Sequence, residues 1–214
     1  MIIQIIIIGS LSYLIGAIPF AYIMVKLIKK TDLRTVGSGN VGATNAMRVL
    51  GWKLGLVVFL LDFLKGFIAV GLVSGIFGSL TILDSSPNLI RIIAGICAIC
   101  GHVWTVFLKF KGGKGVATSA GVFAFLIPIP FLLTLAVFIL VVSISRFVSL
   151  GSISAAAAFP ILTFVFKQDL DLKIFTIFLA VLVTLTHISN LKRLINGTEK
   201  RLSFKSSNTG EKKN

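Results

Sequence analysis

The chain has 214 residues, of which 56% are hydrophobic and 13% are charged, and its mean hydropathy is +1.02. A soluble domain of this length needs a wettable surface, so this composition excludes an ordinary soluble protein. The net charge of +14 predicts anionic partners such as lipid headgroups or phosphates. We expect no nucleic-acid partner, because the basic residues lie between apolar stretches and form no known nucleic-acid-binding module.

Seven apolar stretches are candidates for helices that cross the ~30 Å hydrocarbon core of a bilayer. We therefore predict an all-α integral membrane protein with about seven transmembrane helices. Only Pro128 and Pro130 separate the fourth stretch from the fifth, so counts of six and five remain open. The predicted spans are residues 2–25, 54–78, 89–107, 116–128, 129–145, 150–166 and 172–189.

The distribution of Lys and Arg predicts the orientation of the chain, because short cytoplasmic loops are rich in these residues. With seven spans, 17 of the 21 basic residues lie on one side of the membrane, in segments 26–53, 109–115, 146–149 and 190–214. We expect the N-terminus outside and the C-terminus in the cytoplasm, in the inner or plasma membrane of the cell. Residues 1–200 are expected to form a single membrane domain, and the polar tail 201–214 is expected to be disordered.

The first polar segment combines closely spaced glycines with neutral hydrogen-bonding side chains and one arginine. Gly37, Gly39 and Gly42 allow tight turns whose N–H groups point at an anion. Arg48 offers a planar fork for phosphate oxygens. The glycine spacing also fits GxGxxG, but no βαβ unit fits between two membrane spans, which excludes a dinucleotide site. A plain flexible loop is the alternative. The polar candidates here are Ser38, Asn40, Thr44 and Asn45.

The second polar segment precedes an apolar helix and reads Lys111-Gly112-Gly113-Lys114-Gly115. It is not a Walker loop, because glycine rather than serine or threonine follows Lys114. Two ammonium groups, a flexible backbone and a helix N-terminus together predict an anion-binding site. The alternative is a simple positive-inside topology signal, which would not need three glycines. His102 and Thr118 flank this segment.

Two further segments carry polar residues next to the membrane. His187, Asn190 and Arg193 recur every three residues and so share roughly one helical face. His187 is a candidate general base or hydrogen-bond donor there, with a plain interfacial helix as the alternative. Ser149 and Ser152, taken alone, indicate helix capping or packing.

Asp62 and Lys65 lie within the second predicted span at a spacing of i, i+3. A lone charge inside the bilayer costs on the order of 3 kcal/mol, so we expect a structural ion pair. Cys97 and Cys100 form a CxxC pattern within an apolar stretch that lacks further ligands. Two buried helix residues are therefore favoured over a metal or redox site.

Together these motifs resemble those of the bacterial acyl-phosphate-dependent glycerol-3-phosphate acyltransferases, the PlsY family. The resemblance extends from the first span to Lys200. It rests on Gly-Ser-Gly-Asn-Val-Gly-Ala-Thr-Asn with Arg48, on Gly-His-Val-Trp with Phe-Lys-Gly-Gly-Lys-Gly-Val-Ala-Thr, on Ser149–Ser152, on Asp62–Lys65–Gly66, and on His-x-x-Asn-x-x-Arg-Leu-x-x-Gly-x-Glu. It implies transfer of a fatty acyl group from acyl phosphate to the 1-hydroxyl of sn-glycerol 3-phosphate. The products would be lysophosphatidic acid and phosphate, in phospholipid biosynthesis.

The resemblance also implies roles for individual residues, without a metal or other cofactor. The catalytic group would be Ser38, Arg48, Lys114, His187 and Asn190, with either His187 or the donor's own phosphate as the base. Acyl phosphate would be oriented by Ser38, Asn40, Thr44 and Asn45. The remaining residues expected to bind phosphate or line the site are Gly39, His102, Lys111, Gly112, Gly113, Thr118, Ser149, Ser152 and Arg193.

The partners that follow are acyl phosphate, glycerol 3-phosphate and membrane lipids, with a soluble enzyme that makes acyl phosphate as a further candidate. A small anion or phosphate transporter is the main alternative, and it predicts polar groups near the bilayer midplane and an internal repeat. The sequence has no evident repeat, and its polar motifs cluster at one predicted surface. A structural membrane scaffold is the third alternative, and it leaves the glycine-lysine segment without a purpose.

Overall fold

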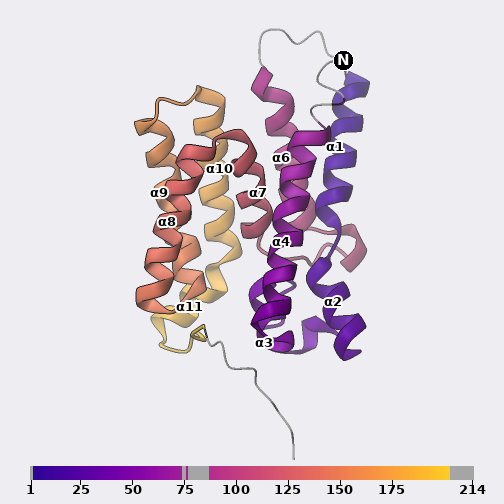
Figure 1. Ribbon diagram of the computed structural model, residues 1–214, viewed down its shortest axis with the longest axis vertical. Coiled ribbons are helices and arrows are strands. Elements are labelled where there is room, and N and C mark those ends of the chain that lie inside the picture. The colour runs from indigo at the N-terminus through magenta and orange to yellow at the C-terminus, as the bar shows by residue number, and fades with distance from the viewer. Residues whose placement is uncertain (1, 74–75, 77–86, 203–214) are drawn as a thin grey trace, which may run out of the picture.

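The chain folds into a bundle of α-helices, as Figure 1 shows for the computed structural model. The structure describes residues 2–73, 76 and 87–202, and these ranges contain no β-strand. The predicted all-α membrane fold is confirmed. Large apolar side chains cover the outside of the bundle: Ile3, Ile144 and Ile161 are 73%, 78% and 65% exposed, which suits contact with lipid rather than water.

The first predicted span consists of two helices, α1 (Ile2–Ala17) and α2 (Phe20–Lys29), with a break at Ile18 and Pro19. Proline lacks a backbone N–H and its ring clashes with the preceding turn, so the helix is interrupted there. The Ile18 carbonyl accepts a hydrogen bond of 2.9 Å from the ammonium group of Lys65. A side chain of the second span thus satisfies a carbonyl at the break in the first.

Two short helices lie between the first and second spans, η1 (Leu33–Thr35) and α3 (Ala43–Leu50). The second span is α4 (Trp52–Ile68), which continues into a π-helical turn, η2 (Ala69–Val73). The end of the predicted span 54–78 lies largely outside the described residues.

The third span is α6 (Pro87–Val103), followed by a short helix, η3 (Val106–Leu108). The next two stretches form separate helices, α7 (Val116–Leu126) and α8 (Pro128–Ser145). The backbone leaves helical geometry at Ile127, as expected for the residue before a proline. The fourth and fifth predicted stretches are therefore two helices rather than one kinked helix.

Three helices complete the described bundle: α9 (Val148–Val165), α10 (Leu170–Thr186) and α11 (Ile188–Ile195). The axes of α10 and α11 differ by 58° across the break at His187. The predicted span 172–189 crosses this break, so its last residues belong to α11 and not to the helix of the span.

Five helical segments of the described chain are long and apolar enough to cross a membrane, and there are six if the bent pair α10–α11 is counted as one span. The 11 residues of α7 extend about 16 Å, roughly half of the hydrocarbon core. These segments together account for the seven predicted stretches. A full crossing by α7 and the side of the membrane that each terminus faces stay predictions.

The largest hydrophobic cluster joins α6, α7, α9 and α10. The ring of Phe123 meets Phe159 edge to face and also contacts Phe175, with centroids 4.7 Å apart in both pairs. Lipid is as apolar as these side chains, so close packing rather than exclusion from water holds such helices together. The cluster fixes α7 against α9 and α10, and so positions the loops that precede α7 and α9.

The polar segments gather toward one end of the bundle. The helices α3 and α11 and the end of α2 lie at the end opposite the N-terminus (Figure 1). This is the arrangement that the Lys and Arg distribution predicts for a shared polar face.

Candidate active site

A cavity of about 540 Å³ lies among α3, α4, α7, α8, α9 and α11. Its lining contains residues from all four polar segments that the sequence singles out. The predicted site residues found in this lining are Ser38, Gly39, Asn40, Thr44, Asn45, Arg48, His102, Lys114, Ser149, Ser152, His187, Asn190 and Arg193.

Four helices begin at this cavity. Their first turns contribute Ala43 of α3, Val116 of α7, Ser149 of α9 and Ser189 of α11 to its lining. The first N–H groups of a helix have no partner within the helix and carry partial positive charge. An anion in this cavity would face several such ends at once, which favours phosphate as a ligand.

The side chain of Asn45 holds the first polar segment in shape. Its Oδ1 accepts a hydrogen bond from the Ser38 N–H at 2.8 Å, and its Nδ2 donates to the carbonyls of Val36 and Asn40 at 3.1 and 3.0 Å. The residue is 1% exposed. Because its amide is already engaged with the loop, we assign Asn45 to positioning Ser38 and Asn40 rather than to holding substrate directly.

The loop before α7 is anchored on the end of α6. The N–H groups of Gly112 and Gly113 donate to the carbonyls of Val103 and His102, each at 3.0 Å. The His102 ring also lies against Gly113, where an added Cβ atom would overlap Nε2 of the ring. This close approach places Lys114, the next residue, at the cavity.

Replacing Gly113 with alanine is expected to destabilise the protein by about 1–3 kcal/mol, because the new methyl group must displace the buried His102 ring. The midpoint of thermal unfolding in detergent measures this loss. Gly9→Ala is the matched control: its backbone is helical, and the nearest described atom to its Cβ position, Cys97 Sγ, lies 3.3 Å away, so little or no loss is expected there. A Gly113 variant as stable as the wild type would contradict the expected overlap.

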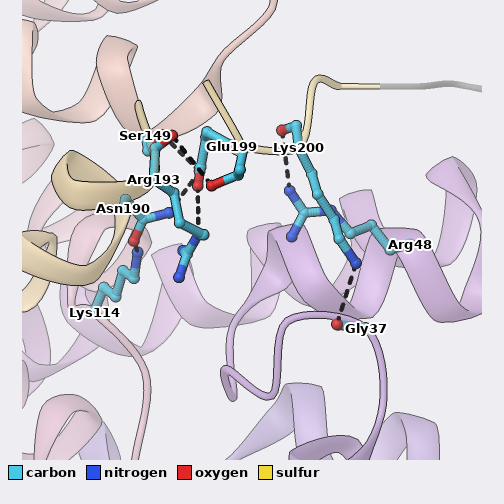
Figure 2. Close-up of polar contacts among 9 residues, drawn as sticks. Gly37, Arg48, Lys114, Ser149, Asn190, Arg193, Glu199 and Lys200 are labelled. Atoms are coloured by element: carbon cyan, nitrogen blue, oxygen red, sulfur yellow. Dashed lines mark hydrogen bonds and ion pairs between the residues drawn. The ribbon is translucent and has the colours of Figure 1, made fainter. Parts of the chain in front are cut away.

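A series of polar contacts links Lys114 to Glu199 (Figure 2). Lys114 Nζ donates to Asn190 Oδ1, and Asn190 Nδ2 donates to Glu199 Oε1 at 2.6 Å. Ser149 Oγ donates to the same carboxylate oxygen at 2.8 Å, and Arg193 Nε donates to Glu199 Oε2 at 2.7 Å. The carboxylate thereby connects α9 and α11 with the loop that carries Lys114.

Glu199 is not among the site residues predicted from the sequence, although it ends the His-x-x-Asn-x-x-Arg-Leu-x-x-Gly-x-Glu pattern. Its side chain is 5% exposed. Burial raises the pKa of Glu199, but hydrogen bonds from Asn190, Arg193 and Ser149 outweigh that effect, so its pKa lies below the ordinary value. The sequence signal for a role of Glu199 is a carboxylate near a cluster of cations, two residues after Gly197.

The segment after α11 also reaches the first polar segment. Arg48 Nη2 donates to the Lys200 carbonyl, and Lys200 Nζ donates to the Gly37 carbonyl, each at 3.5 Å (Figure 2). The Leu202 N–H donates to the Arg146 carbonyl at 2.7 Å. Residues far apart in the chain thus enclose the same cavity.

The cavity carries an excess of positive charge. Burial lowers the pKa of Lys114 to about 8; Glu199 offsets this in part, and Arg193 and Arg48 lower the pKa further. Burial also lowers the pKa of Arg48, whose guanidinium nevertheless stays charged at neutral pH. A bound anion would therefore relieve repulsion among these cations.

The hydrogen bond of His187 defines which of its ring nitrogens is free. Nδ1 lies 2.8 Å from the Val183 carbonyl oxygen, which can only accept, so Nδ1 carries a proton. In the neutral ring, Nε2 therefore holds the lone pair. His187 lines the cavity and is thus placed to accept a proton or a hydrogen bond.

The predicted ion pair of the second span is present at the wall of the cavity. Lys65 Nζ lies 2.8 Å from Asp62 Oδ1, and the side chains are 3% and 2% exposed. His102 Nδ1 lies 3.6 Å from the same carboxylate oxygen. The pair joins the break between α1 and α2 to the ring that supports Gly113, which is a structural role as predicted.

Some predicted binding residues lie outside the cavity lining: Lys111, Gly112, Gly113 and Thr118. Lys111 is exposed, and Thr118 is buried within α7. The two glycines position Lys114, so direct contact between this group and a ligand stays a prediction. Cys97 and Cys100 are half-buried free thiols and are likewise absent from the lining.

The part of the cavity next to α4 and α8 is mainly apolar, with Asp62 of α4 as the one charged residue that these two helices contribute to the lining. Leu56 and Phe59 of α4 face it from one side, and Phe138 and Val142 of α8 from the other. The site therefore combines a cationic region with an apolar groove, as a ligand with a charged head and a hydrocarbon chain requires.

The fold and the site together define an integral membrane protein with a cavity that is cationic at one part and apolar at another, the combination expected of an enzyme that acts on lipids. Residues 6–197 match the family model of glycerol-3-phosphate acyltransferase. The chain belongs to this family. Membership of this enzyme family rules out the transporter and scaffold alternatives.

Two relatives are similar over most of the chain. The glycerol-3-phosphate acyltransferase of Chlorobaculum tepidum is 45% identical, over 90% of this chain and 94% of the relative. That of Thermoanaerobacter pseudethanolicus is 46% identical, over 91% and 94%. The crystal structure of PlsY (YgiH), an integral membrane glycerol 3-phosphate acyltransferase, in its glycerol 3-phosphate form has a TM-score of 0.84 and 39% identity, over 93% of this chain and 96% of that one. Its lysophosphatidic acid form has a TM-score of 0.81 and 36% identity, over 94% and 96%.

Proposed function

We propose that the protein transfers a fatty acyl group from acyl phosphate to the 1-hydroxyl of sn-glycerol 3-phosphate, which forms lysophosphatidic acid and phosphate for phospholipid biosynthesis. The observation that carries the proposal is a single cavity in which several helix N-termini, Arg48 and Lys114 meet an apolar groove. Related structures described as the glycerol 3-phosphate and lysophosphatidic acid forms support the acceptor and the product.

The two phosphate groups are assigned to different parts of the cavity. Arg48, Lys114 and Asn190 hold the phosphate and hydroxyls of the acceptor, where the cations are closest to α11. Ser38 and Thr44, with the first turn of α3, hold the donor and the oxyanion that develops at its carbonyl. These assignments follow the roles that the resemblance implies, and the presence of all five residues in the cavity lining supports them.

The chemistry needs little activation by the protein. The 1-hydroxyl oxygen bonds to the acyl carbon, the bond from that carbon to the phosphate oxygen breaks, and phosphate leaves with the electron pair. Because acyl phosphate is a mixed anhydride, its phosphate is a good leaving group. The hydroxyl proton passes to His187 Nε2, which is left free by the hydrogen bond from Nδ1 to Val183. The donor's own phosphate is the alternative acceptor.

We place the cavity at the cytoplasmic face of the inner or plasma membrane, where soluble glycerol 3-phosphate and a soluble enzyme that makes acyl phosphate have access to it. The Lys and Arg distribution supports this side. Of the predicted polar tail, Arg201 stacks on Phe147 and Leu202 lines the cavity. Residues 203–214 of that tail lie outside the described residues.

The proposed donor can be tested with purified protein in detergent. Acyl phosphate and labelled glycerol 3-phosphate should give labelled lysophosphatidate and equimolar phosphate. Acyl-CoA at the same concentration should give none. Product from acyl-CoA alone would contradict the proposed donor.

The pKa of Lys114 predicts how activity depends on pH. Lys114 is charged below its pKa of about 8 and attracts the acceptor's phosphate only in that form. The value of kcat/KM, which reports the free enzyme, should therefore fall toward tenfold per pH unit above about pH 8. In Lys114→Arg, whose guanidinium stays charged, this decline should disappear. A wild-type profile that stays flat to pH 10 would contradict the assignment.

A further inference from the structure

We propose that Phe63 and Phe131 close the apolar groove and set the longest acyl chain that the enzyme accepts efficiently. The inference rests on the proposed function, because it takes the acyl chain of the donor as the occupant of the groove. The two rings belong to α4 and α8, the same helices that supply the apolar lining of the cavity.

On α4, Phe63 lies one helical turn beyond Phe59 and directly follows Asp62, the last residue of this helix in the cavity lining. Leu56 and Phe59 line the cavity, and Phe63 follows Phe59 at i+4, on the same face of the helix. The rings of Phe59 and Phe63 lie 6.5 Å apart. A chain that extends along this face away from the start of α4 therefore meets the Phe63 ring next.

On α8, Phe131 lies two turns beyond the lining in the same direction. Val142 and Phe138 line the cavity near the end of this helix, and Phe131 precedes Phe138 at i−7, again on one face. The helix α8 runs antiparallel to α4 in Figure 1. Moving back along α8 thus follows the same path as moving forward along α4.

The two faces meet at this pair. The ring centroids of Phe63 and Phe131 lie 6.4 Å apart with the ring planes inclined by 47°. Phe67 stacks behind Phe63 at 6.3 Å, and its ring meets Phe125 edge to face at 5.2 Å. Phe131 also packs against the central hydrophobic cluster. The groove is therefore closed by rings that are supported from behind.

The physical consequence is a limit on chain length. The donor's chain lies in micelle or bilayer hydrocarbon before it binds, so each methylene group gains from close packing against the groove lining and not from removal from water. A chain that reaches Phe63 and Phe131 gains nothing more by extension, because further carbons must displace packed rings or fold back. The wild-type kcat/KM should thus rise with chain length, reach a maximum and then fall.

The test compares acyl phosphates of increasing chain length, presented at a fixed mole fraction in mixed micelles so that partitioning is held constant. In Phe63→Ala/Phe131→Ala, the maximum of kcat/KM should move to longer chains by several methylene groups. In Phe131→Trp, which enlarges the obstruction, it should move to shorter chains. Leu60→Ala and Leu132→Ala remove exposed residues of the same helices, 48% and 58% exposed, and should keep the wild-type maximum.

The outcomes are distinct. The inference would be overturned if both the alanine and the tryptophan variants kept the wild-type chain length at the maximum of kcat/KM. A wild-type profile that never declines with chain length would overturn it as well. If the double variant does not fold, the shift to shorter chains in Phe131→Trp still decides the question. Absence of transfer by the wild type from acyl phosphate of any length would instead contradict the proposed function, and the inference would fall with it.

Discussion

Replacing Lys114 with methionine is expected to lower kcat/KM about 10³-fold, equivalent to about 4 kcal/mol of transition-state stabilisation. Methionine keeps an unbranched side chain of similar length, so the main loss is the positive charge. In the wild type, that charge lies at the cavity, donates to Asn190 and is brought there by the anchored loop at Gly112 and Gly113. Steady-state kinetics with acyl phosphate and glycerol 3-phosphate measure the loss.

The control for this variant is Lys192→Met. Lys192 is an exposed lysine of α11 outside the cavity lining, so the same change of charge there should alter kcat/KM by less than about twofold. Equal losses in the two variants would indicate a general effect of net charge. Near-normal turnover in Lys114→Met, at an unchanged melting temperature, would refute the assigned role.

Replacing Lys65 with methionine is expected to destabilise the protein by about 3–5 kcal/mol, because the carboxylate of Asp62 would remain buried without its ion-pair partner. The same change also removes the hydrogen bond to the Ile18 carbonyl at the break between α1 and α2. Unfolding of the purified protein in detergent, followed by heat or denaturant, measures the loss.

A double variant distinguishes the cost of leaving the Asp62 charge unpaired from the cost of changing the packing of the Lys65 side chain. Asp62→Asn/Lys65→Met has no buried charge at this position, so it should recover part of the stability that Lys65→Met loses. Greater loss in the double variant than in the single one would show that the Asp62 carboxylate is stabilised mainly by groups other than Lys65, such as His102, whose Nδ1 lies 3.6 Å from Asp62 Oδ1.

Three breaks between helices show which features of the fold can be predicted from the sequence and which cannot. The length of the apolar stretches and Pro128 are local features, and they correctly predict separate helices α7 and α8. The break at Pro19 is equally local, yet the hydrophobicity of residues 2–25 conceals it, because apolar composition reports burial in lipid and not helix continuity. The bend at His187 has the same origin: an apolar run of suitable length continues through a change of helix direction.

The sequence by itself determined the membrane class, the polar segments and the ion pair of Asp62 and Lys65, because hydropathy, glycine spacing and an i, i+3 charge pair act over a few residues. Only the tertiary structure decided that Glu199 connects Ser149, Asn190 and Arg193, that Asn45 supports its own loop, and that Lys111 stays outside the cavity. Those outcomes depend on which helix ends meet in space. That meeting is set by the packing of whole helices, and no short stretch of sequence contains it.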